Sequence, residues 1–210
     1  MDGRFITFEG PDGSGKSTHL RRAATWLEER GISVVCSREP GGTALGQAVR
    51  QVFLDSPWDR PDGGVEALMV FAARRQHLRE VIDPALMAGQ WVLCDRFTDS
   101  TFAYQGSGRG ETRERLLELD HWATGTRRPE CTLLFDLPSE VARRRSQAPG
   151  AGVNRLDVED VEFYERVRGC YLDLAAAEPE RFRVIDSAGS LETTAGQVEA
   201  ALTGLLEAVA

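Results

Sequence analysis

The chain has 210 residues, of which 41% are hydrophobic and 28% charged, and its formal net charge is −8. This length and apolar content suit one domain with a sizeable core, and no apolar stretch is long enough to span a bilayer. The negative charge argues against binding to nucleic acid or to an acidic membrane, because both need a basic surface. We therefore expect a single domain over residues 1–210 that meets any anionic ligand with local cations.

The four cysteines are scattered, with no close pair that could ligate zinc or form a redox couple. Cys36, Cys94 and Cys131 lie in or beside apolar, strand-like runs, which predicts buried, reduced thiols. Reduced thiols, and the lack of a basic amino-terminal segment followed by an apolar run, predict a cytoplasmic protein.

Short apolar runs rich in β-branched residues alternate with helical patterns along the chain. The predicted strands are 4–9, 32–36, 91–95, 131–136 and 182–186. The predicted helices are 16–30, 44–54, 64–87, 111–124, 139–147, 159–177 and 191–209. Such alternation predicts an α/β fold with a five-stranded parallel sheet flanked by helices, and with ligands at the carboxyl ends of the strands.

The first predicted strand runs directly into a glycine-rich loop that opens the first predicted helix. The loop matches the pattern G-x-x-x-x-G-K-[ST] without a mismatch. Its glycines let successive N–H groups face phosphate oxygens, and the helix adds the positive end of its dipole. Lys16 would bridge β- and γ-phosphate oxygens, and the Ser17 hydroxyl would ligate magnesium. We predict a nucleoside triphosphate site made by Gly10, Pro11, Asp12, Gly13, Ser14, Gly15, Lys16, Ser17 and Thr18.

Two further strands end in charged residues. Asp95 ends the third predicted strand and could hold magnesium through water, while Arg96 beside it could bridge two phosphoryl groups. Arg38 and Glu39 follow the second predicted strand, just before a Pro-Gly turn. Because the carboxyl ends of parallel strands share one edge, these residues should face the same crevice as the phosphate loop.

A long predicted helix places Phe71 three residues before Arg74, so both lie on one helix face. A ring can stack on a base while the guanidinium binds a phosphate through two prongs. The segment 99–106 adds hydroxyl, amide and aromatic groups suited to a base edge and a sugar, among them Ser100, Thr101, Tyr104 and Gln105. Together these residues predict a second nucleotide site.

An arginine-rich stretch over about 143–157 is the candidate lid. Its glycines would allow closure, and closure would bring arginines over a transferring phosphoryl group. Arg143, Arg145 and Arg155 are all candidates, and the sequence does not choose among them.

Four motifs, in this order, resemble the thymidylate kinase family of the bacterial type. They are the phosphate loop at 8–18, Arg-Glu-Pro-Gly-Gly-Thr at 38–43, Asp-Arg-Phe at 95–97 and Ser-Thr-Phe-Ala-Tyr-Gln-Gly at 100–106. The likeness runs from about residue 5 to 186. It implies a P-loop NTPase fold of the nucleoside monophosphate kinase type with a lid, and transfer of the γ-phosphoryl of ATP to dTMP. It also implies a requirement for Mg²⁺ and a homodimer, for which the helix 64–87 is the expected surface.

The resemblance further implies roles for single residues. Asp12 would lie near the acceptor's 3′-hydroxyl and magnesium, and Tyr104 would crowd the 2′ position to favour deoxyribose. The acceptor phosphate would be held by Arg38, Arg74 and Arg96, and the thymine edge would lie near Ser100, Thr101 and Gln105. Phe71 would stack on thymine, although many members place this ring one residue earlier, where the chain has Val70.

The catalytic cations implied by the resemblance are Lys16, Arg96 and the lid arginines Arg145 and Arg155. The phosphate loop contains no arginine, which resembles the branch of the family that supplies its catalytic arginine from the lid. The lid of this chain reads Asn-Arg-Leu-Asp at 154–157, where the family usually has Asp-Arg-aliphatic-Glu.

Two other classes of protein remain as alternatives. A kinase acting on dUMP or on a deoxynucleoside would use the same fold, and the latter would need a carboxylate base such as Glu9 or Glu39. A nucleotide-driven switch without an acceptor would need a guanine-reading Asn-Lys-x-Asp segment or large partner surfaces. The chain contains no Asn-Lys-x-Asp segment, and it does contain an apparent second nucleotide site.

Overall fold

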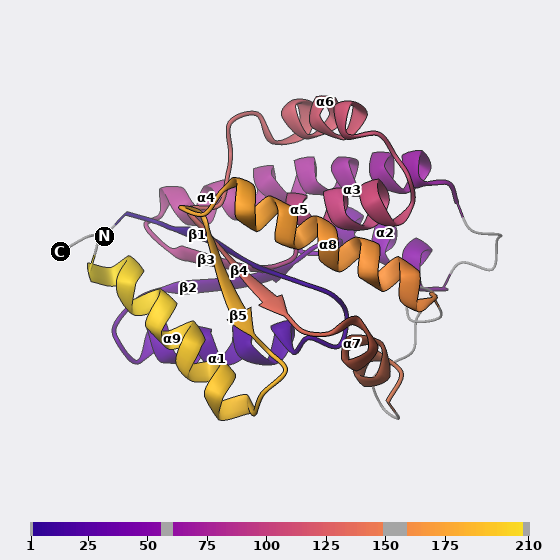
Figure 1. Ribbon diagram of the computed structural model, residues 1–210. Coiled ribbons are helices and arrows are strands. Elements are labelled where there is room, and N and C mark those ends of the chain that lie inside the picture. The colour runs from indigo at the N-terminus through magenta and orange to yellow at the C-terminus, as the bar shows by residue number, and fades with distance from the viewer. Residues whose placement is uncertain (1, 56–60, 149–158, 208–210) are drawn as a thin grey trace.

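The computed structural model describes residues 2–55, 61–148 and 159–207 (Figure 1). Five strands form one parallel sheet in the order β2-β3-β1-β4-β5. The strands are β1 (Phe5–Glu9), β2 (Val34–Arg38), β3 (Trp91–Asp95), β4 (Cys131–Asp136) and β5 (Phe182–Asp186). All five are among the predicted strands, and the α/β fold class is confirmed.

Helices cover both faces of the sheet, as expected for parallel strands. They are α1 (Lys16–Glu28), α2 (Ala44–Asp55), α3 (Gly63–His77), η1 (Leu78–Ile82), α4 (Asp83–Met87), α5 (Thr98–Thr101), η2 (Phe102–Gly108), α6 (Arg113–Thr124), α7 (Ser139–Ser146), α8 (Val161–Ala177) and α9 (Leu191–Glu207). Figure 1 shows α1 and α9 below the sheet and α3, α6 and α8 above it. In the described parts of the chain, no helix is long and apolar enough to cross a membrane.

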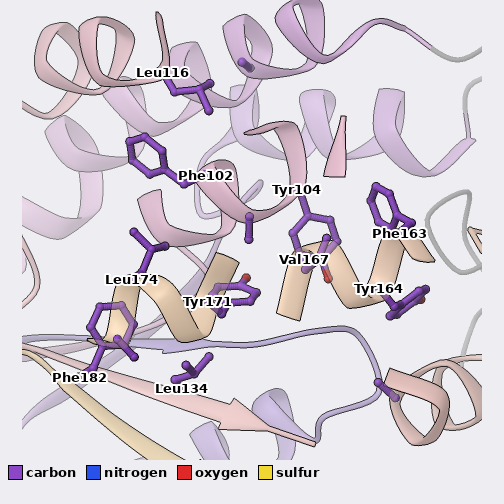
Figure 2. Packing of buried hydrophobic residues seen from close by; sticks show 14 of the residues in the cluster. Phe102, Tyr104, Leu116, Leu134, Phe163, Tyr164, Val167, Tyr171, Leu174 and Phe182 are labelled. Carbon is purple, nitrogen blue, oxygen red and sulfur yellow. The ribbon is translucent and has the colours of Figure 1, made fainter. Parts of the chain in front are cut away.

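Each face of the sheet has its own apolar core. Below the sheet, Leu27 of α1 and Leu202 of α9 pack against strand residues in one cluster. Above the sheet, Phe102, Tyr171 and Leu174 belong to a second cluster, which joins η2 and α8 to the sheet (Figure 2). The upper layer therefore carries the predicted second nucleotide site on a packed support.

The edge position of β2 corrects one prediction. Cys36 lies in β2 and is exposed, whereas Cys94 and Cys131 in the inner strands β3 and β4 are buried as predicted. An edge strand has a neighbour on one side only, so its residues are less covered. The strand also starts two residues later than predicted and ends at Arg38, which brings Arg38 into the sheet itself.

The predicted long helix 64–87 is divided into α3, the π-helical η1 and α4. Pro84 stands at the start of α4 and has no N–H to donate, so the hydrogen-bonding pattern changes just before it. The helical segment formed by α5 and η2 was not predicted at all. Its glycines and β-branched residues favour a loop locally, but packing against α8 holds it in helical form.

Candidate nucleotide-binding site

A cavity of about 420 Å³ opens at the carboxyl ends of β1, β2 and β3. Most of the residues predicted from the sequence line it: Asp12, Gly13, Gly15, Lys16, Ser17, Thr18, Arg38, Arg74, Asp95, Arg96, Ser100, Thr101, Tyr104, Gln105 and Arg145. Gly10, Pro11 and Ser14 shape the loop without being among the lining residues. The structure therefore places the phosphate loop and the predicted second site in one cavity.

The phosphate loop has the backbone conformation that its glycines allow. Gly13 has a φ of +80°, and a Cβ there would lie 2.3 Å from the carbonyl oxygen of Ala142 in α7. Gly10 has a φ of +135°, and a Cβ there would lie 2.4 Å from the carbonyl oxygen of Phe135. Both positions therefore require glycine for conformation and for space.

Lys16 lies at the start of α1 with its ammonium inside the loop. Its Nζ donates to the Pro11 carbonyl oxygen at 2.8 Å and to the Ser14 hydroxyl at 3.3 Å. Burial, together with the nearby Arg96, lowers the pKa of Lys16 to about 8. A polyphosphate entering the loop would supply the negative charge that this buried cation lacks.

Ser17 and Asp95 meet across the loop, although 78 positions separate them in the sequence. The Ser17 hydroxyl donates to Oδ2 of Asp95 at 2.5 Å. One hydroxyl and one carboxylate, completed by phosphate oxygens and water, form a donor set that suits Mg²⁺. The described residues contain no cluster of three or more His, Cys, Asp or Glu side chains that could hold a metal.

Arg96 is held in an unusual backbone conformation. Its φ is 72°, the left-handed region that a residue with a long side chain seldom adopts. Its guanidinium donates to Asp12 at 2.7 Å, to the Tyr104 hydroxyl at 3.1 Å and to the Ser100 hydroxyl at 3.0 Å. Burial opposes ionisation of Asp12, but Arg96 and Lys16 outweigh it and hold the pKa of Asp12 at about 2.

Glu9 binds the backbone and side chains that follow Arg96, a role that the sequence did not predict. One Glu9 oxygen accepts from the Phe97 N–H at 2.6 Å, and the other accepts from the Ser100 hydroxyl at 2.5 Å and the Tyr171 hydroxyl at 3.1 Å. Burial and the charge of Asp99 raise the pKa of Glu9 to about 7, against these hydrogen bonds. Glu9 is fully buried and does not line the cavity.

Arginines also line the part of the cavity that the sequence predicts to be the second nucleotide site. Arg74 is 1% exposed, whereas the Arg38 side chain is 44% exposed and reaches Asp95 at 3.4 Å. Arg50 of α2 also lines the cavity, and burial together with Arg38 and Arg96 lowers its pKa. Arg50 was missed from the sequence because nothing marked α2 as facing the site. So much positive charge in one place predicts an anionic ligand.

The prediction that Phe71 stacks on a base is not supported by its position. Phe71 is 2% exposed and packs in the core cluster with Phe102, while Val70 lines the cavity. The ring does lie near Arg74, with 4.8 Å between the ring centroid and the guanidinium carbon, as the spacing predicted. Phe53 of α2 supplies an aromatic wall instead. Its spacing of three from Arg50 was the available signal.

The arginines of the candidate lid are described only in part. Arg145 in α7 lines the cavity, and its guanidinium donates to the carbonyl oxygens of Ser187 at 2.8 Å and Ala188 at 3.2 Å. Arg155 and most of the predicted lid lie outside the described residues.

A parallel sheet of this order, with a phosphate loop after β1 and a second cationic site at the ends of β2 and β3, defines a P-loop nucleotide kinase. Residues 8–198 match the family model of thymidylate kinase. The chain therefore belongs to the thymidylate kinase family.

Its relatives match over nearly their whole length. A thymidylate kinase of Ectopseudomonas mendocina is 48% identical over 209 residues, which is 99% of each chain. One from Neisseria gonorrhoeae is 48% identical over 204 residues, 97% of this chain and 98% of the relative. The crystal structure of thymidylate kinase from Ehrlichia chaffeensis superposes with a TM-score of 0.80 at 35% identity, covering 97% of this chain and 99% of that one.

Proposed function

We propose that the protein transfers the γ-phosphoryl group of ATP to dTMP, giving ADP and dTDP. The observation that carries this proposal is one shared cavity, with Lys16 and the phosphate loop on one side and Arg38, Arg74 and Arg96 on the other. Two anionic phosphate groups can approach each other there because these cations reduce the repulsion between them. The membership of the thymidylate kinase family supports dTMP as the acceptor.

The chemistry needs positioning and charge more than a proton acceptor. The acceptor phosphate is already an anion, so no general base is required for the attack. Lys16 and Arg96 would neutralise the oxygens of the moving phosphoryl group, and Mg²⁺ held by Ser17 and Asp95 would supply further positive charge. Catalysis is then mainly alignment of the two phosphates plus electrostatic stabilisation.

We propose that the acceptor base lies against Val70 and Phe53, with Ser100, Thr101 and Gln105 near its polar edge. Gln105 is itself held by a hydrogen bond of 2.9 Å from its amide to Glu66. Tyr104 would crowd the 2′ position, because Arg96 and Asp12 anchor its hydroxyl. A ribose acceptor would then meet a ring that cannot turn aside.

The deoxynucleoside kinase alternative is less well supported. It needs a free carboxylate at a 5′-hydroxyl, whereas both oxygens of Glu39 accept hydrogen bonds from neighbouring side chains. Glu9 is fully buried and outside the cavity. A nucleoside would also leave the arginines of the acceptor end without an anion.

The test is a coupled assay of ADP release from ATP and magnesium, with separate acceptors. We expect high turnover with dTMP, weaker turnover with dUMP and ribosyl TMP, and none with thymidine. Leakage to dUMP is expected, since one methyl group changes affinity by about 1–3 kcal/mol. Turnover on thymidine would favour a nucleoside kinase. ATP hydrolysis at a rate that no added acceptor changes would favour a nucleotide-driven switch.

We also propose that Arg145 and Arg155 act in a lid over about 143–157 that closes on the phosphates. Arg145 already lines the cavity beside the phosphate loop, which supports its part. Charge-preserving variants Arg145→Lys and Arg155→Lys, compared with the alanine variants, test it through kcat at saturating ATP. The proposal fails for an arginine whose alanine variant keeps the wild-type kcat.

A homodimer is proposed through the outer faces of α3 and α6, which lie side by side (Figure 1). Val65 and Leu68 of α3 and Leu117 and Trp122 of α6 are large apolar residues that are exposed there. Sedimentation should give twice the chain mass of 23.1 kDa. Leu68→Asp should halve the mass, whereas Met87→Asp, a matched change of an exposed apolar residue in α4, should not.

We propose a cytoplasmic location. Four free cysteines, two of them in the buried strands β3 and β4, are consistent with a reducing compartment. Cell fractionation tests this, and recovery with the secreted or membrane fraction would contradict it.

A further inference from the structure

Arg74 stands at the end of a row of four hydrogen-bonded side chains, which come from β2, the loop that follows it, and α3. The Arg74 Nε donates to Oε2 of Glu39 at 2.7 Å, and the other Glu39 oxygen lies 2.9 Å from Nδ1 of His77. The Nε2 of His77 lies 2.6 Å from the hydroxyl of Ser37. Glu39, Arg74 and His77 are all buried, with exposures of 4%, 1% and 0%.

The chemistry of the partners sets the direction of these hydrogen bonds. A carboxylate only accepts, so Nδ1 of His77 carries the proton that faces Glu39. In the neutral imidazole, a proton on Nδ1 leaves Nε2 to accept the proton of the Ser37 hydroxyl. Each of the three hydrogen bonds that join Ser37, His77, Glu39 and Arg74 then has one donor and one acceptor.

These hydrogen bonds leave one nitrogen of the Arg74 guanidinium available to a ligand. Its Nη2 donates to the Thr101 hydroxyl at 3.0 Å, and its Nε is taken by Glu39. Its Nη1 is buried without a hydrogen-bond partner among the described residues, and Arg74 lines the main cavity. An unsatisfied buried N–H of a cation is costly unless a ligand completes it, and an anionic oxygen would do so.

The ring of His77 lies close to the backbone of Gly42. A Cβ on Gly42 would lie 2.4 Å from both Cδ2 and Nε2 of His77. Only glycine at position 42 therefore leaves room for the imidazole. The absence of a side chain at Gly42 therefore allows the imidazole to lie between Glu39 and Ser37.

We propose that Ser37, His77 and Glu39 form a positioning relay that sets the Arg74 guanidinium for the acceptor phosphate. His77 is a positioning residue in this scheme, since it acts through Glu39 and never touches the nucleotide. The inference rests on the proposed function in one respect, namely that Arg74 binds the phosphate of the acceptor.

The relay is tested with two variants, each of which places an amide near the position of one ring nitrogen. His77→Asn places an amide near the Nδ1 position and can still donate to Glu39, whereas His77→Gln places its amide near Nε2 and cannot. We expect the KM for dTMP to rise about 10-fold in His77→Gln and to stay within about 3-fold of wild type in His77→Asn. The KM for ATP should stay unchanged in both.

A merely structural role would give a different result. It would raise the KM for dTMP equally in both variants, or would raise the KM for ATP as much as that for dTMP. Either result would overturn the relay. If the His77 variants do not fold, Ser37→Ala removes only the half-buried hydroxyl that is farthest from Arg74 in the relay. It should raise the KM for dTMP about 2-fold, and an unchanged KM would count against the proposal.

A second readout does not depend on turnover. In a nitrogen-15 NMR spectrum, the Nε–H signal of Arg74 should exchange slowly with water in wild type and in His77→Asn, and rapidly in His77→Gln. Equal exchange in all three proteins would overturn the relay even if the enzyme phosphorylates dTMP. Absence of dTMP phosphorylation by the wild type, with the exchange pattern as expected, would overturn the proposed function and leave the positioning of Arg74 standing.

Discussion

On the donor side of the cavity, Lys16 and Ser17 belong to one short loop, and its shape comes from glycines at positive φ. On the acceptor side, Arg74 comes from α3 and Arg96 follows β3. The buried carboxylate of Glu39 accepts from Arg74, and the carboxylate of Asp12 accepts from Arg96. The donor side is therefore shaped by backbone conformation over a few residues, and the acceptor side by side chains far apart in the sequence. Substitutions should reveal this difference.

The largest expected effect is from Lys16→Ala on the donor side. Removing the only phosphate-loop cation should lower kcat by at least about 100-fold, because no other group of the loop can neutralise the γ-phosphoryl oxygens. The fold should survive, since Lys16 is a buried cation whose removal relieves desolvation. The coupled assay measures the loss, with Arg22→Ala, a surface cation of the same helix, as the control. A near-normal kcat in Lys16→Ala would contradict the assigned role.

On the acceptor side, Arg74→Ala should lower stability more than Arg38→Ala does. Losing Arg74 leaves Glu39 buried without its cation, so stability should fall by about 3 kcal/mol and the KM for dTMP should rise about 10- to 100-fold. Arg38 is 44% exposed and makes one contact of 3.4 Å to Asp95, so its loss should cost less than about 1 kcal/mol of stability. Denaturant unfolding and dTMP titrations compare the two, and an equal loss of stability would undermine the contrast.

Gly13→Ala tests the backbone side in a milder way. Its φ of +80° and the clash with the Ala142 carbonyl oxygen should cost about 1–3 kcal/mol and raise the KM for ATP. Gly31→Ala is the matched control, because Gly31 has a φ of +78° but nothing within 4 Å of a Cβ. If the two variants behave alike in ATP affinity, the packing of α7 on the loop has no part in the site.

The last expected effect is on the pH dependence of stability. The folded protein binds the proton of Glu9 more tightly than the unfolded chain, because its pKa is raised from 4.5 to about 7. This group therefore contributes stability below about pH 4.5 that is lost as the pH rises through about 7. Glu9→Gln keeps an acceptor for the Phe97 N–H and should flatten this part of the curve. Thermal unfolding from pH 4 to 8 measures the slope, and an identical slope in both proteins would refute the assignment to Glu9.

Several features of this protein were determined by the sequence alone. The apolar runs predicted all five strands, and the glycine-lysine motif predicted the phosphate loop, because both depend on residues next to each other in the chain. The charged residues at the ends of two predicted strands also predicted that Arg38 and Asp95 lie next to each other at the carboxyl ends of β2 and β3.

Only the tertiary structure decided the rest. It placed Val70 rather than Phe71 on the cavity wall, since one helical position, about 100° of rotation, separates the core face from the cavity face. It also made the segment 98–108 helical, against its local propensity, through packing on α8. The partners of Arg74 and Arg96 lie in other elements, and no periodicity within one element records which distant carboxylate an arginine will meet once the sheet is formed.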